Sequence, residues 1–504
     1  MGHRENRGKG EGMRKFWFAG GLIAAAALTF AAVALTAPSN EDELLKDEKH
    51  FLEQSNKTFE GGKKAAQAKN MEVVGTNNLG GRGFNADVWF HEGYAYIGQW
   101  GFTDWASGSK TRFCPSGERA GVAVVDARNP ANPVVVSRLQ NPAGTSAEDV
   151  VVYQAQSGPL AGRDIAAAGI QVCGGSRFDT SFFRGIMLWD VTDPATPVFL
   201  GKKSTGCCTR GLHEFEVEHR ADLGRTFAYA TVPASEYADS PSPSGFRDQQ
   251  GRGDFRLIDI TNPRKPVAVS DWGVIHDAGG PLGPGQGCDP DPVFGHGAEP
   301  SHDGKIVFLS YWDSGFVALD VTNPANPVLT GDTDYQPDED GDGHSSMWDD
   351  ERELLFSADE DFGKHCGPGI EPGYGYLRIW DYSSVADPGV QEGVQIGEFR
   401  TTNSQTGGPT GSGDYTIHNP WLVGTDVYIS WYSDGVRVVD ASDPTAPEEV
   451  AFFVPPAGQN PVKPSQRGVL SQTPQVWGVV VDEATGLVYA SDMNTGLWIL
   501  RRTD

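Results

Sequence analysis

The stretch GFVALDVTNPANPVLT at residues 315–330 decides the fold, because copies of it recur along the chain. Each copy is an apolar run that ends in Asp, followed by a turn rich in Asn, Asp and Pro and by a second apolar run. Short runs bounded by such residues are typical of antiparallel β-strands. The other clear copies are GVAVVDARNPANPVVV (121–136), GIMLWDVTDPATPVFL (185–200), DFRLIDITNPRKPVAV (254–269) and GVRVVDASDPTAPEEV (435–450).

The copies recur about every 60 residues, a spacing typical of propeller or solenoid repeats. A degenerate copy occupies 376–390 and a truncated one 496–502. Further alternating runs precede each copy, so that each unit contains four strands, which is the content of a propeller blade. The residue that ends the first run is, in chain order, Asp126, Asp190, Asp259, Asp320, Asp381, Asp440 and Arg501.

The two ends of the repeat region predict how the ring closes. The last unit lacks an outer strand, and an isolated strand pattern stands at 71–76. Pairing the two would remove an open sheet edge. We therefore predict an all-β fold, a single seven-bladed β-propeller of four-stranded blades spanning residues 71–504, with the ring closed by the N-terminal strand that completes the last blade.

The repeated string, two apolar residues followed by Asp-x-[Ser/Thr]-[Asn/Asp]-Pro-x-x-Pro, resembles the LVIVD-repeat family of exported β-propellers. The resemblance covers nearly all of the chain after residue 70. It implies a propeller fold and an extracytoplasmic location, and it implies no defined activity. The turn residues themselves are expected to be structural, because Asn and Asp bond their own backbone in turns and Pro ends a strand. They are Asn129, Asp193, Asn262, Asn323 and Asp443.

The N-terminal region predicts export. Arg14 and Lys15 precede an uncharged apolar run at 16–35, so residues 1–37 are expected to be a signal peptide or an uncleaved membrane anchor. The start of translation at Met1 or Met13 stays open. Residues 38–70 are charged and are interpreted as a tether. We therefore expect the protein to be secreted or anchored to the outer side of the cytoplasmic membrane.

Composition narrows the possible partners. The net charge of −27 argues against nucleic-acid binding, because phosphate backbones would be repelled, and we expect a monomer. In an exported chain the six cysteines favour disulfides. Cys114 and Cys173 fall in the same loop of neighbouring units and are the preferred pair. Gly-rich stretches lack the strand and helix context of a nucleotide site, and none is expected.

The first position of the innermost strand of each unit holds the main candidate site. Equivalent residues of these strands surround the central channel, and four consecutive units place a histidine there. Imidazoles converging on one axis, together with Glu148, are suited to a transition metal such as Fe, Cu, Zn or Mn. This resembles, by architecture only, the carotenoid-cleavage oxygenases. The same histidines also fit a structural role between blades. The position holds Ala86, Glu148, His213, His296, His344, His418 and Trp477.

A second candidate is an acidic loop whose spacing follows the calcium loop pattern D-x-D-x-D-G with an acidic residue in the twelfth position. Its expected ligands are Asp338, Asp340, Asp342 and Asp349. The same residues also fit a solvated acidic loop that binds no ion, because residues 344–349 are needed as a strand.

Two functions remain open from the sequence. The long loops and all six cysteines fall on the side at which the innermost strands begin, which favours a disulfide-stiffened binding surface for a protein or a small ligand. The alternative is a metal-dependent oxidoreductase or oxygenase that uses the four histidines. Disulfides that serve only stability are equally consistent with this loop pattern.

Overall fold

The chain divides into two compact units, residues 1–37 and residues 38–504, and all described residues belong to the second. Among the described residues no helix has the length and apolar character needed to cross a bilayer. The apolar run at 16–35 and most of the predicted tether lie outside the described residues. The computed structural model describes residues 67–103, 112–115, 117, 120–175, 179–206, 209–233, 235–236, 253–279, 293–312, 314–333, 335, 341–362, 374–383, 391–406, 413–457 and 473–504.

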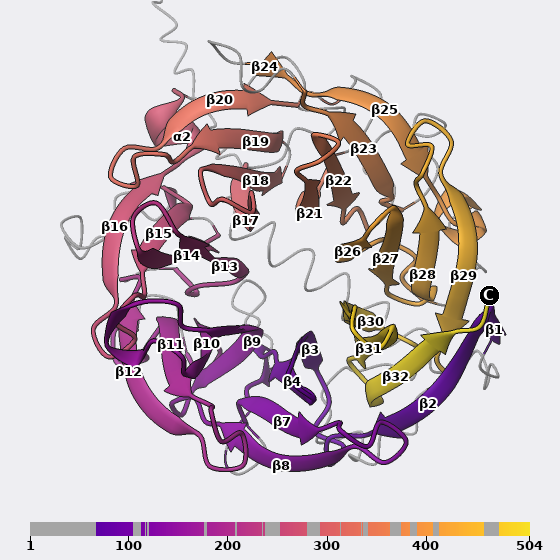
Figure 1. Ribbon diagram of the computed structural model, residues 1–504, viewed down its shortest axis with the longest axis horizontal. Helices are drawn as coiled ribbons and strands as arrows, with labels where there is room; N and C mark the ends of the chain where they lie inside the picture. Colours follow the sequence, from indigo (N-terminus) through magenta and orange to yellow (C-terminus); the bar gives the residue numbers. More distant parts are fainter. Residues whose placement is uncertain are drawn as a thin grey trace, which may run out of the picture. The chain divides into compact units, whose positions relative to one another are not determined.

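The described residues fold into four-stranded antiparallel groups that stand around a common centre, with the first strand of each group innermost (Figure 1). The first groups are β3 (Asn85–His91), β4 (Tyr94–Gln99), β7 (Val122–Asp126) and β8 (Val134–Leu139); β9 (Thr145–Gln154), β10 (Asp164–Val172), β11 (Gly185–Asp190) and β12 (Val198–Ser204); β13 (Phe215–Arg220), β14 (Arg225–Thr231), β15 (Phe255–Asp259) and β16 (Val267–Trp272). The next are β17 (Phe294–Pro300), β18 (Ile306–Trp312), β19 (Gly315–Asp320) and β20 (Val328–Asp332); β21 (Gly343–Asp349), β22 (Leu354–Asp359), β23 (Leu377–Asp381) and β25 (Val394–Phe399). The last are β26 (Pro420–Val423), β27 (Asp426–Trp431), β28 (Gly435–Asp440) and β29 (Glu448–Val454); β30 (Val476–Asp482), β31 (Leu487–Asp492) and β32 (Gly496–Arg502).

The N-terminal strand joins the C-terminal group. β2 (Met71–Asn77) pairs antiparallel with β32, with Met71 opposite Arg502 and Asn77 opposite Leu497. The sequence predicts a strand at this place. It does not predict β1 (Gln67–Lys69), which lies in the predicted tether and pairs with β29. The edge of β29 accepts these polar, exposed residues because backbone pairing needs no apolar side chains, and Lys69 Nζ adds a bond to the Glu449 carbonyl of 3.0 Å.

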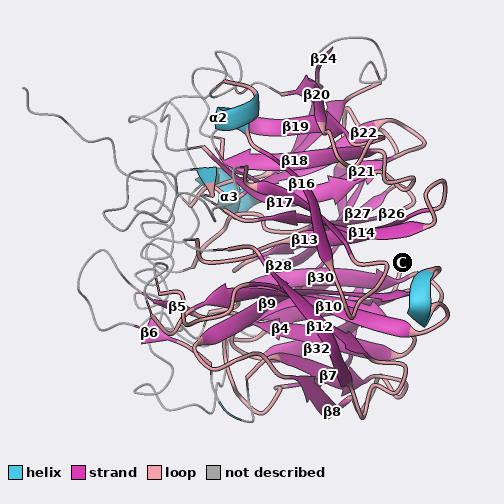
Figure 2. Ribbon diagram, turned by 90° about the vertical axis from the view of Figure 1, so that its left-hand side faces the viewer, coloured by secondary structure: helices cyan, strands magenta, loops and turns pink. Residues whose placement is uncertain are grey.

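Four small elements lie on one side of the sheets. They are β5 (Phe102–Thr103), β6 (Arg112–Phe113), α2 (Val274–Asp277) and α3 (Thr402–Thr406) (Figure 2). The helices α2 and α3 lie in the connections that lead into β17 and β26, so this is the side at which the innermost strands begin. Elsewhere, β24 (Gln391–Glu392) runs parallel to β20, and η3 (Gly158–Leu160) is a 3₁₀ turn between β9 and β10.

The repeated aspartates end the third strand of their groups, as the sequence predicted. The strands β7, β11, β15, β19, β23 and β28 stop at the six repeat aspartates. Each of these carboxylates accepts the backbone N–H two residues further on, for example Thr322 N to Asp320 Oδ1 at 2.7 Å. In the next turn Asn323 Oδ1 accepts the Ala325 N–H at 3.2 Å. These Asx turns confirm the structural role of the turn residues.

The apolar core lies between neighbouring groups of strands. In one cluster, Phe227 and Leu257 of the third group pack against Val307, Leu309 and Val317 of the fourth. All five side chains are almost fully buried, and burial of one such side chain contributes about 1.5–3 kcal/mol. Neighbouring groups are held face to face in this way, and this packing fixes how the innermost strands converge.

Candidate metal centre at the start of the innermost strands

The structure brings the four histidines of the predicted column into one line of contacts. His213 lies just before β13, His296 in β17, His344 in β21 and His418 just before β26. Ring centroids are 4.3 Å apart for His213 and His296, 3.9 Å for His296 and His344, and 4.3 Å for His344 and His418. Residues far apart in the chain therefore meet because each occupies the same register position of its strand.

Two further residues of the column close this line into a circuit. The Trp477 ring lies 4.3 Å from that of His418, and its Nε1 donates to Glu148 Oε1 at 3.1 Å. Glu148 Oε2 in turn lies 2.8 Å from His213 Nδ1. We call this set, Glu148, His213, His296, His344, His418 and Trp477, the histidine circuit. The seventh member of the column, Ala86, is buried and has no polar side chain to contribute.

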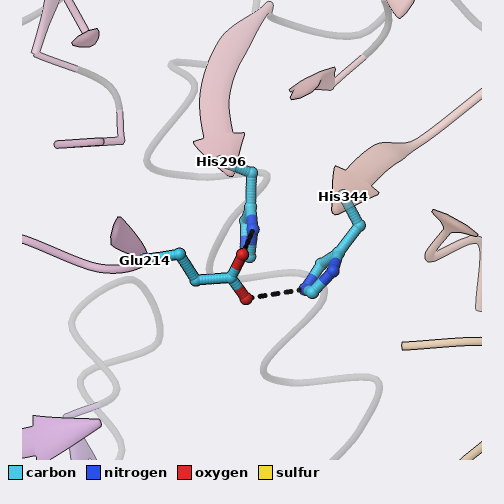
Figure 3. A group of neighbouring side chains, drawn as sticks. All are labelled: Glu214, His296 and His344. Atoms are coloured by element: carbon cyan, nitrogen blue, oxygen red, sulfur yellow. Dashed lines mark ion pairs between the residues drawn. The ribbon is translucent and has the colours of Figure 1, made fainter. Parts of the chain in front are cut away.

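Two carboxylates flank the circuit. Glu214 lies 3.7 Å from His296 Nδ1 and 3.8 Å from His344 Nε2, with its two oxygens turned toward these rings (Figure 3). Glu360 lies 3.4 Å from His344 Nε2 and 3.8 Å from His418 Nε2. Each carboxylate forms a group with its two histidines in which one ligand atom per residue lies within 4.8 Å of the others. Both groups are suited to one metal ion.

Sequence reasoning missed Glu360. It follows the second strand of its group, β22, and not an innermost strand, so the register that grouped the histidines did not include it. Its only sequence signal is the acidic run DED at 359–361. The Tyr432 hydroxyl donates to Glu360 Oε1 and holds this carboxylate beside the histidines.

Burial keeps the histidines neutral. It lowers the pKa of His296, His344 and His418 well below the usual value, and neighbouring imidazoles lower it further. Neutral imidazole is the form that binds metal ions. The Nδ1 atoms of all three, and Nε2 of His418, have no hydrogen-bond partner among the described residues. Buried polar atoms without a partner are rare and costly, and coordination of an ion would satisfy such nitrogens.

The contact between His213 and His296 also fits a shared ion. Their Nε2 atoms lie 2.8 Å apart. Metal–imidazole bonds of about 2.0–2.1 Å place two ligand nitrogens of one ion about 3 Å apart. His213 is further held by Gln171 Nε2, 2.7 Å from its Nδ1. Contacts of this kind orient metal-binding histidines in proteins.

Aromatic side chains surround the circuit. Trp312 lies 5.7 Å from the His296 ring and stacks on Phe294 at 5.2 Å. Tyr432 stands edge-on to His418 at 5.3 Å, and Trp100 lies 5.5 Å from Trp477. All of these aromatic side chains are buried. The circuit therefore lies in an environment of low polarity, in which electrostatic interactions are strong.

A second layer of carboxylates follows one residue further along the innermost strands. We call Asp87, Asp149 and Glu214 the carboxylate tier. Burial raises the pKa of each well above the usual value, and neighbouring carboxylates raise it further. Glu299 lies further along the innermost strand β17, where its Oε1 accepts the Trp348 N–H at 3.4 Å.

The acidic loop is not assembled as one site by the described residues. Asp342 and Asp349 stand at opposite ends of the extended strand β21. Seven strand residues span about 20 Å, so these two carboxylates cannot share an ion. Asp349 instead pairs with Arg352 Nε at 2.5 Å. The other two predicted ligands, Asp338 and Asp340, lie outside the described residues.

The disulfide predicted between Cys114 and Cys173 is present, with Cα atoms 5.2 Å apart. Cys114 follows β6 and Cys173 follows β10, so the bond joins two neighbouring groups of strands. The remaining cysteines, Cys207, Cys208, Cys288 and Cys366, lie outside the described residues.

Comparison with known proteins bears on the fold. No curated protein matches the sequence. Among solved structures the chain is similar to Raptor from Chaetomium thermophilum, at 11% identity and a TM-score of 0.49, over 86% of this chain and 29% of Raptor. It is also similar to the β-propeller domain of Cps50 (Swd1) from Myceliophteria thermophila, at 11% identity and a TM-score of 0.46, over 86% of this chain and 100% of that domain. The chain thus spans under a third of the Raptor chain.

The family comparison addresses the repeats directly. The LVIVD repeat matches residues 82–103, 303–334 and 421–453. The second and third matches contain the copies at 315–330 and 435–450, and the first covers the strand pair β3 and β4. The resemblance to the LVIVD repeat predicted from the sequence is thereby confirmed: three segments of the chain match this repeat, which is the repeat of a β-propeller family.

Proposed function

We propose that this protein is a metal-binding propeller whose functional centre is a transition-metal ion held by the histidine circuit. The observation that supports this best is the set of buried nitrogens of His296, His344 and His418 that have no hydrogen-bond partner among the described residues. Glu214 and Glu360 complete the two groups of candidate ligands. Imidazole with carboxylate suits Fe, Mn, Cu or Zn.

The chemistry that this centre would support is oxidation or oxygenation of a substrate with dioxygen as the electron acceptor. The substrate would reach the ion from the side at which the innermost strands begin. Iron, copper or manganese would supply the redox step. The chain's own residues would orient the ion and exclude water, since Trp312, Tyr432 and Trp477 surround the ligands and are buried. The metal-dependent oxidoreductase inferred as an alternative from the sequence thus becomes the leading function.

A binding module for a protein or small ligand is the second candidate. The Cys114–Cys173 bond ties together the loops of two neighbouring groups on one side of the sheets, which supports a stiffened surface. The bond also supports an extracytoplasmic location, where disulfides persist. In this proposal the leader or anchor at 1–37 and the tether place the propeller outside the cytoplasmic membrane as a monomer.

We infer further that the strand groups are the seven blades of one closed ring. The pairing of β2 with β32 supports closure, because it supplies the outer strand that the last group lacks. The histidine circuit supports it as well. It runs through six innermost strands or their approaches and returns from the last group to the second through the contact of Trp477 with Glu148, as expected if the groups form a ring.

The decisive experiment is metal analysis of the full chain, purified without chelator. We expect about one transition-metal ion per chain, lost in the double variant His296→Gln/His344→Gln. The matched control is His219→Gln, which lies on β13 outside the circuit, where it contacts Thr226 at 3.0 Å. This control should retain the ion.

The opposite result would also be clear. If no sample holds or takes up Fe, Cu or Zn, and any bound Mn is retained by His296→Gln/His344→Gln, while circular dichroism shows an intact β fold, the histidines are structural. The binding module would then be the better proposal. Metal that is lost equally in the control would show non-specific binding.

A further inference from the structure

A small cavity lies beside the histidine circuit, along the innermost strands. Its volume is about 80 Å³. Its lining includes all three residues of the carboxylate tier, together with Glu216 and Glu299. The lining contains no Lys, Arg or His, so none of these carboxylates meets a basic side chain inside the cavity. Buried carboxylates in such numbers need either protons or a cation to balance them.

Two residues of the cavity wall carry polar atoms that make no hydrogen bond with the described residues. Glu214 Oε1 and Ser346 Oγ have no hydrogen-bond partner among the described residues, and the two residues are only 8% and 9% exposed. Both residues line the cavity. Ser346 is not acidic, so its unsatisfied hydroxyl is an observation independent of the carboxylates. An ion with its bound water would satisfy both atoms.

Residues opposite the carboxylates are small, which leaves room for an ion. At the register position of Asp87, Asp149 and Glu214, two other innermost strands have Gly297 and Gly478. A Cβ at Gly478 would collide with Asp87 Oδ1, and one at Gly297 would lie 3.1 Å from Glu214 Oε2. The carboxylates therefore extend into space that larger side chains would fill.

Three of the carboxylates lie close enough to share one ion. One oxygen each of Asp87, Glu148 and Glu214 falls within 4.8 Å of the others. Asp87 is held in place by Asn419 Nδ2, which lies 3.2 and 3.0 Å from its two oxygens. A set made only of oxygen ligands selects hard cations and differs from the histidine set nearby.

We propose that a hard divalent cation of the Mn²⁺, Mg²⁺ or Ca²⁺ class binds at this cavity, held by Asp87 and Glu214, which line it, and by Glu148 beside it. Its ligands are all carboxylates, unlike those of the histidine-held ion, and Asp87 belongs to this site alone. Glu148 and Glu214 lie next to both sites, so the two ions would share neighbouring carboxylates.

The test uses Mn²⁺ as the probe. The full chain is stripped with chelator, dialysed against Mn²⁺ and assayed for bound ion by electron paramagnetic resonance. We expect about one Mn²⁺ at this site, displaced by Ca²⁺. Asp87→Asn, nearly isosteric, should weaken Mn²⁺ binding by at least about 10- to 100-fold, the range seen when even a supporting contact of a metal site is lost.

Two matched variants separate the possible outcomes. Glu299→Gln removes a carboxylate of the same cavity that lies outside the ligand group, and it should bind Mn²⁺ as the wild type does. His418→Gln removes a histidine without touching the carboxylate tier, and it should also keep Mn²⁺. Loss of Mn²⁺ in either of these variants would overturn the proposal, because the ion would then be bound elsewhere.

Wild-type protein alone also gives a decisive reading, should Asp87→Asn fail to fold. Mn²⁺ and Ca²⁺ should each raise its thermal unfolding midpoint. No bound Mn²⁺ and an unchanged midpoint would show that shared protons balance the carboxylates, and would overturn the proposal. Absence of transition metal with Mn²⁺ retained would instead refute only the histidine-held ion.

Discussion

Trp477 Nε1 donates a hydrogen bond to Glu148 Oε1 at 3.1 Å, although 329 residues separate the two in the chain. Glu148 is fully buried, and its other oxygen lies beside His213. The indole thus links the last group of strands to the second and orients the carboxylate that contacts the first histidine.

Replacing the Trp477 indole should lower the free energy of unfolding by the contribution of its hydrogen bond to Glu148. Trp477→Phe keeps most of the ring but leaves Glu148 Oε1 without its donor, so we expect a loss of about 1–3 kcal/mol in the free energy of unfolding. Chemical denaturation measures it. Trp498→Phe is the control, because Trp498 donates to Thr495 at 2.8 Å at a less buried site. Equal losses in the two variants would contradict a special role for Trp477.

The raised pKa of the Glu216 carboxyl should make the free energy of unfolding depend on pH. Burial, and then Glu218, raises the pKa of Glu216 from 4.5 to about 8. Between these values the folded chain keeps a proton that the unfolded chain releases, so the contribution of this group to stability falls as pH rises from about 4.5 to 8. Glu216→Gln cannot ionise, and it should match the wild type near pH 4 and exceed it above pH 8.

Denaturation of chelator-treated protein across this pH range measures the effect. The control is Glu448→Gln, at an exposed position at the start of β29. Its free energy of unfolding should differ from that of the wild type by the same amount at every pH. If the difference in free energy of unfolding between Glu216→Gln and the wild type is also independent of pH, the Glu216 carboxyl titrates normally.

Removing the disulfide should lower stability. Cys114 and Cys173 close a loop with a sequence separation of 59 residues, and bonds of this kind contribute about 2–4 kcal/mol. The double variant Cys114→Ser/Cys173→Ser should unfold at correspondingly lower denaturant concentration under oxidising conditions. An unchanged midpoint would mean that sheet packing alone holds the two loops.

Removing β2 should destabilise the last group of strands. A chain that begins at residue 78 leaves β32 with an unpaired edge and loses the buried side chain of Met71. We expect a loss of at least about 3 kcal/mol, since burial of Met alone contributes about 1.5–3 kcal/mol. The exposed edge should also promote association, visible by light scattering. A chain that begins at residue 67 retains β1 and β2 and is the control.

Much of the fold could be predicted because the same local chemistry is repeated. Asp320 and its equivalents end a strand in each repeat, so one correctly assigned repeat predicts where the strands of the other repeats end. The column of His213, His296, His344 and His418 followed from register alone, since residues at one position of the innermost strands lie at one level around the common centre. Their contact distances confirm that alignment.

The rest of the site depends on contacts that no register describes. Glu360 reaches the histidines from beyond a second strand, and Tyr432 holds it there. The calcium pattern at 338–349 illustrates the opposite failure. Its spacing assumed a loop, but pairing of Gly343–Asp349 with β22 extends this segment and separates Asp342 from Asp349. Backbone pairing with a distant strand overrides a local motif.

The histidine circuit takes one residue from each of six consecutive repeat units, and no two of its members come from the same unit. A fragment that lacks the second or the last unit would lose the contact between Trp477 and Glu148 that closes the circuit. Occupancy of the centre would therefore report on assembly of the entire molecule. An incompletely translated or clipped chain would lack the closed circuit.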